Sequence, residues 1–187
     1  MIEAELKARV RDPEALLAAL DQRAAAEGAT YSDTYYDTPD RALTTTDREL
    51  RLRVIDQDES RTCRLTYKEA AVPGTGSKPE HETSVADRVV LATLFAGLGL
   101  TVLVELTKHC TNYRFDRAGR PVLATVVTVP GLAGTFLEVE TLVPTAAEVP
   151  SALGAIRDLL AELGIGAADL DSRDYTDLVI RARAGPA

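Results

Sequence analysis

Short runs in which charged and apolar residues alternate are the feature of this chain that most constrains its fold. At the N-terminus Glu3, Glu5 and Lys7 occupy every second position, with Ala4 and Leu6 between them. Because side chains two apart in an extended strand point to the same side, this run has one charged face and one apolar face. The N-terminal segment is therefore predicted to be a β-strand.

Segments of this type recur along most of the chain and predict about eight strands. They cover residues 2–10, 31–37, 49–56, 61–69, 80–85, 101–116, 121–129 and 135–143. Helical spacing appears in three other stretches: one that begins at Asp12 and Pro13 and ends near Gly28, one before Gly99, and one before Gly164. So many strands in consecutive groups, with only three helices, predict an α+β fold around an antiparallel sheet, with closure into a barrel as one form of it.

Composition is that of a globular protein of 187 residues, for which one domain over residues 1–187 is the expectation. Hydrophobic residues make up 45%, and no apolar run reaches the length of a membrane span. The net charge of -8 argues against general binding to nucleic acid or anionic membranes. The first residues contain no export signal, so a cytoplasmic protein with free Cys63 and Cys110 is expected.

Charges of the same sign are grouped on individual strands. The acidic pairs are Glu3 with Glu5 and Glu138 with Glu140, and the basic pairs are Arg51 with Arg53 and Arg64 with Lys68. Any one of these faces, taken alone, fits the solvated side of a half-buried strand. Like charges on one face repel each other, however, so their grouping indicates a function rather than a merely soluble surface.

The grouped charges are suited to a metal ion and a polyphosphate bound together. Two acidic pairs would form an all-oxygen site for Mg²⁺ or Mn²⁺. Arginine binds phosphate oxygens bidentately, and lysine supplies a point charge. If the charged faces lined the interior of a barrel, the apolar faces would turn outward, and the three amphipathic helices would cover them.

The same residues resemble the CYTH superfamily, the triphosphate tunnel metalloenzymes, which include class IV adenylate cyclases and triphosphatases. Residues 3–7 (EAELK) match its ExExK signature, and six further segments follow in the family's order. These are YYDTP at 35–39, ELRLR at 49–53, LTYK at 65–68, KPEHE at 78–82, FLEVE at 136–140 and YTDL at 175–178. The resemblance spans nearly the whole chain and implies an eight-stranded antiparallel tunnel, with helices packed on its outside, that holds a triphosphate.

The resemblance also implies roles for particular residues. Metal ligands would be Glu3, Glu5, Glu138 and Glu140, with Glu82 as a weaker candidate, and phosphate would be bound by Lys7, Arg51, Arg53, Lys68 and Lys108. Arg64 shares the face of Lys68, and Arg114 and Arg173 are further candidates for phosphate binding. The residues expected to carry catalysis are Glu3, Glu5, Lys7, Glu138 and Glu140.

Three positions depart from the family pattern. Cys110 stands where a second basic residue is usual, and Arg114 on the same strand face is the candidate substitute. Residues 122–129 contain no carboxylate where many members have a metal-binding Asp. Asp174 replaces the Ser of the closing motif. A weaker or differently composed metal site is the expected consequence.

Three functions remain open at this point. The first is a cyclase that converts ATP to cyclic AMP and pyrophosphate, favoured because the stretches MIEAELKARV and KPEHET resemble class IV adenylate cyclases. The second is a triphosphatase acting on inorganic triphosphate, thiamine triphosphate or a nucleoside triphosphate, and the third is a noncatalytic polyphosphate or nucleotide binder. The expected partners are thus Mg²⁺ or Mn²⁺ and ATP or another triphosphate, and a homodimer is the assembly considered.

Overall fold

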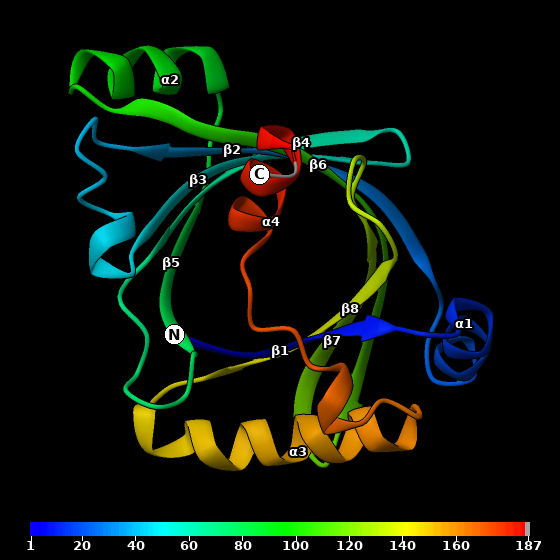
Figure 1. The fold of residues 1–187 in the computed structure, drawn as a ribbon. Coiled ribbons are helices and arrows are strands. Elements are labelled where there is room, and N and C mark those ends of the chain that lie inside the picture. The colour runs from blue at the N-terminus through cyan, green and yellow to red at the C-terminus, as the bar shows by residue number, and fades with distance from the viewer. Residues whose placement is uncertain (186–187) are drawn as a thin grey trace.

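The computed structural model describes residues 1–185, which form eight strands and four α-helices around a barrel (Figure 1). The strands are β1 (Ile2–Val10), β2 (Glu27–Asp37), β3 (Glu49–Gln57), β4 (Ser60–Lys68), β5 (Lys78–Ser84), β6 (Thr101–Arg117), β7 (Arg120–Thr128) and β8 (Thr135–Val143). The α-helices are α1 (Pro13–Asp21), α2 (Arg88–Gly97), α3 (Val149–Glu162) and α4 (Tyr175–Ala184).

All neighbouring strands pair antiparallel, and the barrel closes in the order β1-β5-β4-β3-β2-β6-β7-β8. The predicted α+β fold with an antiparallel barrel is therefore confirmed. The main error concerns the first helix, which was predicted to end near Gly28 but ends at Asp21. The reason is that β2 begins at Glu27, where it pairs with Asn112 of β6.

The three predicted helices lie on the outside of the barrel and cover the apolar strand faces. Leu16 and Leu20 of α1 belong to one buried cluster with α3, and that cluster includes the outward side chains Ala4 and Ala8 of β1. Phe95 of α2 belongs to a second cluster over β2 and β3. Burial of these apolar faces under helices is what allows the charged faces to turn inward.

Helix α4 was not predicted, and it occupies a different place. Figure 1 shows it within the ring of strands, and its residues Tyr175, Leu178 and Val179 are buried. They pack with the inward-facing side chains of β6, β7 and β8, among them Leu106, Cys110, Val127 and Phe136. One part of the barrel interior is thus an apolar core closed by α4, and the remainder is polar.

Asp37 has a local structural role in the Asp-Thr-Pro turn at the end of β2. Its carboxylate accepts hydrogen bonds from the backbone N–H groups of Thr38, Leu43 and Thr44 at 2.7, 2.9 and 3.0 Å. Burial alone would raise the pKa of Asp37, but a hydrogen bond from the Thr44 hydroxyl at 2.6 Å, together with the three backbone hydrogen bonds, lowers it to about 2.

Replacing Asp37 by Ala is expected to lower the free energy of unfolding by about 1–2 kcal/mol, because three backbone N–H groups of the turn lose their acceptor. Urea denaturation followed by circular dichroism measures this change. Asp40→Ala, at an exposed position three residues later, is the matched control, with an expected change within about 0.5 kcal/mol. Equal stability of the two variants would contradict the turn assignment.

Both cysteines are free, as expected, with Cys110 buried and Cys63 half-buried. Among the described residues, no helix has the length and apolar character needed to cross a membrane.

Candidate metal and phosphate site

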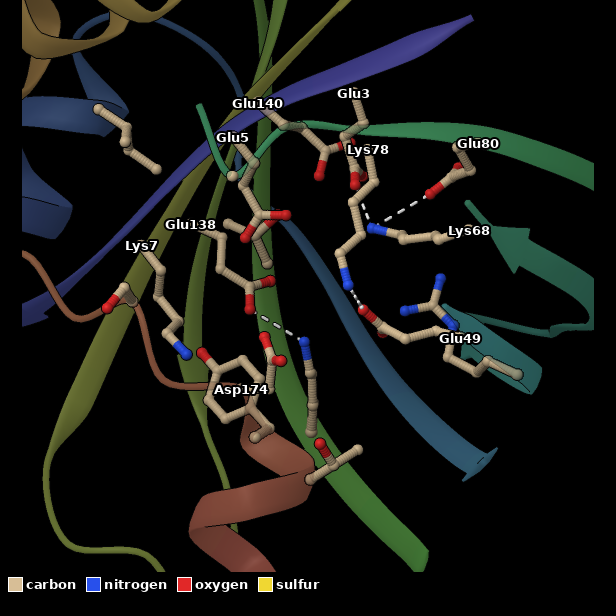
Figure 2. Close-up of a pocket in the computed structure, with 18 of the residues that line it drawn as sticks. Glu3, Glu5, Lys7, Glu49, Lys68, Lys78, Glu80, Glu138, Glu140 and Asp174 are labelled. Atoms are coloured by element: carbon tan, nitrogen blue, oxygen red, sulfur yellow. Dashed lines mark hydrogen bonds and ion pairs between the residues drawn. The ribbon is translucent and has the colours of Figure 1, made fainter. Parts of the chain in front are cut away.

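The polar part of the barrel interior is a cavity of about 360 Å³, within the range of about 300–1,000 Å³ that is typical of ligand sites. The charged side chains that alternate along the strands point into it from several sides (Figure 2). The predicted site residues that line the cavity are Glu3, Glu5, Lys7, Arg51, Arg53, Lys68, Glu82, Lys108, Glu138 and Glu140. Inward orientation of the charged faces, inferred from strand parity alone, is thus what the structure has.

Three predicted phosphate-binding residues do not line this cavity. Arg64 forms an ion pair with Glu82 at 2.5 Å, and Arg114 lies 3.6 Å from Glu27. Arg173 forms two hydrogen bonds with Asp171, at 2.8 and 2.6 Å. Their side chains are about half exposed, and each is held by a carboxylate outside the cavity or at its edge. We therefore leave these three arginines out of the proposed site.

Three carboxylates converge at one wall of the cavity, as Figure 2 shows. Glu5 of β1 is the register partner of Glu140 of β8, and one carboxylate oxygen from each of Glu3, Glu5 and Glu140 lies within 4.8 Å of the others. Burial, followed by repulsion from Glu3 and Glu138, raises the pKa of Glu5 to about 7. Burial and the charges of Glu3 and Glu5 also raise the pKa of Glu140.

This group of carboxylates fits a divalent metal ion. Oxygen donors suit Mg²⁺ or Mn²⁺, and a bound cation would remove the repulsion that otherwise makes three buried, crowded carboxylates unfavourable. The other two predicted ligands have different partners in the structure. Glu138 accepts a hydrogen bond from Lys108 at 2.9 Å, and Glu82 is paired with Arg64. Among the described residues, the carboxylate oxygens that converge are those of Glu3, Glu5 and Glu140, so these are the residues that would hold the metal, although Glu3 also contacts Lys68.

Each lysine in the cavity lies against an acceptor. Lys68 contacts Glu3 and lies 3.2 Å from Glu80, and Lys78 donates to Glu49 at 2.7 Å (Figure 2). Lys7 donates to the backbone carbonyl of Arg173. These ammonium groups are held inside the barrel by carboxylates and carbonyls, and they would be available to a polyanion that competes for them.

The distribution of basic residue types sets this cavity apart from the rest of the molecule. The chain has only four lysines among 21 basic residues, and all four line the cavity. The basic residues elsewhere in the chain are all arginines. Such a concentration of a flexible, point-like cation in one cavity is not explained by solubility, and it suits the binding of phosphate oxygens.

Arg53 is oriented by a buried carboxylate. Its Nε and Nη2 atoms donate to the two oxygens of Asp33 at 2.6 and 2.7 Å, and the Asp33 side chain has no exposed surface. Burial acts to raise the pKa of Asp33, but the charge and hydrogen bonds of Arg53 lower it to about 2. The guanidinium group also lies 4.5 Å from the ring centre of Tyr31.

Sequence reasoning missed several residues that line or support the cavity. Glu49 and Glu80 share strand faces with predicted site residues but were not included, and Lys78 was quoted only as part of a motif. Restriction of lysine to the predicted site could have identified Lys78. No local signal identified Asp33, because it contacts Arg53 only through the pairing of β2 with β3.

The structure shows where the three departures from the family pattern lie: in strand β7, at Cys110 and at Asp174. Leu123 and Thr125 of β7 are the register partners of Glu140 and Glu138, so this strand adds no carboxylate to the metal site. Cys110 is in the apolar core beside α4, where burial raises the pKa of its thiol to about 12. Asp174, directly before α4, lines the cavity. These positions are consistent with the weaker or differently composed metal site expected from the sequence.

Both histidines are outside the cavity lining, because His81 and His109 have the strand parity opposite to that of Glu80, Glu82 and Lys108, which line it. The ring of His81 stacks on Tyr67 with centroids 6.1 Å apart, and its Nε2 lies 2.7 Å from Glu69. Within residues 1–185 the cavity therefore has no histidine to act as an acid or base.

The sequence and fold were compared with those of known proteins. The chain is 25% identical over 179 residues to the adenylate cyclase CyaB of Aeromonas hydrophila, a match that covers 94% of this chain and 87% of that protein. Its structure is similar to that of PH1819 from Pyrococcus horikoshii OT3, with a TM-score of 0.84, 27% identity and coverage of 95% and 98% of the two chains.

HpAC1 from Hippeastrum, for which a dominant triphosphatase activity is described, shares the fold with a TM-score of 0.63 at 19% identity, over 100% of this chain and 97% of that one. Residues 1–175 match the CYTH domain family, almost the full length of the chain. With seven motif segments on its strands and C-terminal helix, and with this barrel around a charged cavity, the chain belongs to the CYTH domain family.

Proposed function

We propose that this protein is a metal-dependent enzyme that acts on a triphosphate bound inside the barrel. The observation that supports the proposal is the placement of three converging carboxylates and six basic side chains in one cavity. The basic side chains are Lys7, Arg51, Arg53, Lys68, Lys78 and Lys108. The positive charge of a divalent ion on the carboxylates and the negative charge of a polyanion on the basic residues balance each other. Either ligand bound alone would leave its charge unbalanced in the cavity.

In this proposal Glu3, Glu5 and Glu140 hold Mg²⁺ or Mn²⁺, which supplies Lewis-acid chemistry at a phosphate oxygen. Arg51 and Arg53 lie on one inward face of β3 and bind phosphate oxygens through their guanidinium groups. Lys108 faces them and neutralises charge that develops on the departing phosphate. The closed barrel limits access of water, which strengthens each of these interactions.

We infer a reaction of the class IV adenylate cyclase type, in which the ribose 3′-hydroxyl attacks the α-phosphorus and pyrophosphate leaves. Similarity over nearly the full length to the Aeromonas adenylate cyclase supports this assignment. ATP is then the substrate, and a homodimer is the assembly considered.

Hydrolysis of a triphosphate is the second candidate, and one feature of the cavity favours it. Most of the side chains that line the cavity are charged, which suits phosphate groups more than a nucleoside. Water would then attack the γ-phosphorus. The triphosphatase activity described for HpAC1 belongs to a protein of the same fold.

Products identify the reaction. The purified protein is incubated with ATP, inorganic triphosphate or thiamine triphosphate in Mg²⁺ or Mn²⁺, and nucleotides and phosphates are separated by anion-exchange chromatography. Cyclic AMP with an equal amount of pyrophosphate is the expected result. Release of orthophosphate without cyclic AMP would replace the cyclase by a triphosphatase, and tight binding without turnover under both metals would leave a noncatalytic binder.

A further inference from the structure

Tyr175, the first residue of α4, lies between two lysines of the cavity. Lys7 Nζ is 4.2 Å from the centre of the Tyr175 ring, and Lys108 Nζ is 4.1 Å from it. The ring is itself fixed by an edge-to-face contact with Phe136, with centroids 5.3 Å apart at an angle of 82°. Two cations from strands on different sides of the cavity are thus held by one aromatic ring.

The hydroxyl of Tyr175 makes no hydrogen bond of normal geometry within the described part of the chain, although the side chain is only 6% exposed and the Glu138 carboxylate interacts with it. A buried polar group without a partner is unfavourable and needs an explanation. Burial, the charge of the Glu138 carboxylate and its hydrogen bonding with the hydroxyl raise the pKa of the phenol, so the hydroxyl keeps its proton and can donate it to Glu138 or to a ligand. Because Tyr175 lines the cavity, a bound ligand can accept that bond.

We propose that Tyr175 is a positioning residue that holds the ammonium groups of Lys7 and Lys108 and donates its hydroxyl hydrogen to an oxygen of the bound polyphosphate. The hydroxyl part of this inference rests on the proposed function, because it requires a polyphosphate in the cavity. The ring part depends only on the fold. Helix α4 therefore closes the apolar core and also places Tyr175 between the two lysines.

Two substitutions separate the ring from the hydroxyl. Tyr175→Phe keeps the ring and removes the donor, and Tyr175→Leu removes both. Tyr67→Phe is the matched control, because Tyr67 stacks on His81 and does not line the cavity. Circular dichroism and thermal unfolding establish that each variant folds, and Tyr175→Phe retains the packing against Phe136.

The ring is tested by NMR of protein labelled with ¹³C at the lysine Cε atoms, which gives signals from only four lysines, all of the cavity. Single Lys→Arg variants assign the signals. Ring current is expected to move the Cε protons of Lys7 and Lys108 upfield of those of Lys68 and Lys78. The upfield positions are retained in Tyr175→Phe and lost in Tyr175→Leu. Unchanged signals in Tyr175→Leu would overturn the positioning of the lysines.

The hydroxyl is tested by isothermal titration of inorganic triphosphate in Mg²⁺. A hydrogen bond to a charged oxygen contributes enough that Tyr175→Phe is expected to bind about 10- to 100-fold more weakly than wild type, while Tyr67→Phe binds normally. Equal affinity of Tyr175→Phe and wild type would overturn the donor role. If wild-type protein binds no triphosphate, the proposed function and the donor role both fail, while the NMR result still decides the role of the ring.

Discussion

Replacing Glu140 by Gln is expected to lower the metal-dependent turnover by about a hundredfold or more. Glu140 lies opposite Glu5 in the barrel, and its carboxylate converges with those of Glu3 and Glu5. Gln preserves the size of the side chain but removes the charge that attracts a divalent ion. Loss of an outer hydrogen-bond partner alone costs a metal site about 10- to 100-fold, so loss of a ligand costs at least as much.

Mn²⁺ affinity, measured by electron paramagnetic resonance, shows whether the loss arises at the metal. The same variant is expected to bind Mn²⁺ more weakly at every pH tested, and its thermal stability without metal is expected to be equal to or above that of wild type, because one repelling charge is gone. Glu59→Gln, at an exposed turn between β3 and β4, is the control and leaves turnover and Mn²⁺ affinity unchanged. Full activity of Glu140→Gln would remove this residue from the metal site.

Replacing Arg53 by Met is expected to lower the free energy of unfolding by about 3–5 kcal/mol, since Asp33 is then left buried and charged without a partner. Guanidinium denaturation at pH 7 measures the loss. Arg61→Met, which breaks the exposed pair with Asp56 on the same two strands, is expected to cost less than about 1 kcal/mol. A double variant, Asp33→Leu with Arg53→Met, is expected to regain much of the lost stability, because no buried charge remains.

The ion pair of Asp33 with Arg53 also makes the stability of the protein depend on pH, with stability falling as the pH falls. Folding lowers the pKa of Asp33 to about 2 from an ordinary value near 4. The ionised Asp33 therefore makes its full contribution to the free energy of unfolding above about pH 4. That contribution disappears as the pH falls from about 4 to about 2. The difference in stability between wild type and the Arg53→Met variant should therefore narrow over this interval. A constant difference down to pH 2 would contradict the pairing.

Strand parity predicted much of the site because alternation is a local property of the chain. Once Glu3 and Glu5 are known to share a face, and Glu138 and Glu140 another, closure of the sheet brings the faces together. Parity also placed His81 correctly outside the cavity. It did not distinguish between residues of the same parity on one strand: Lys68, at the end of β4, lines the cavity, whereas Arg64, in the middle of that strand, lies in an ion pair with Glu82.

By itself, the sequence determined the strands, their charged and apolar faces, and the family, because period-two alternation and short motifs are local features of the chain. The tertiary structure alone decided which carboxylates converge, that Asp33 holds Arg53, and that α4 enters the barrel with Tyr175 between two lysines. These contacts join residues far apart in the chain, and they depend on register and barrel closure, which no local pattern encodes.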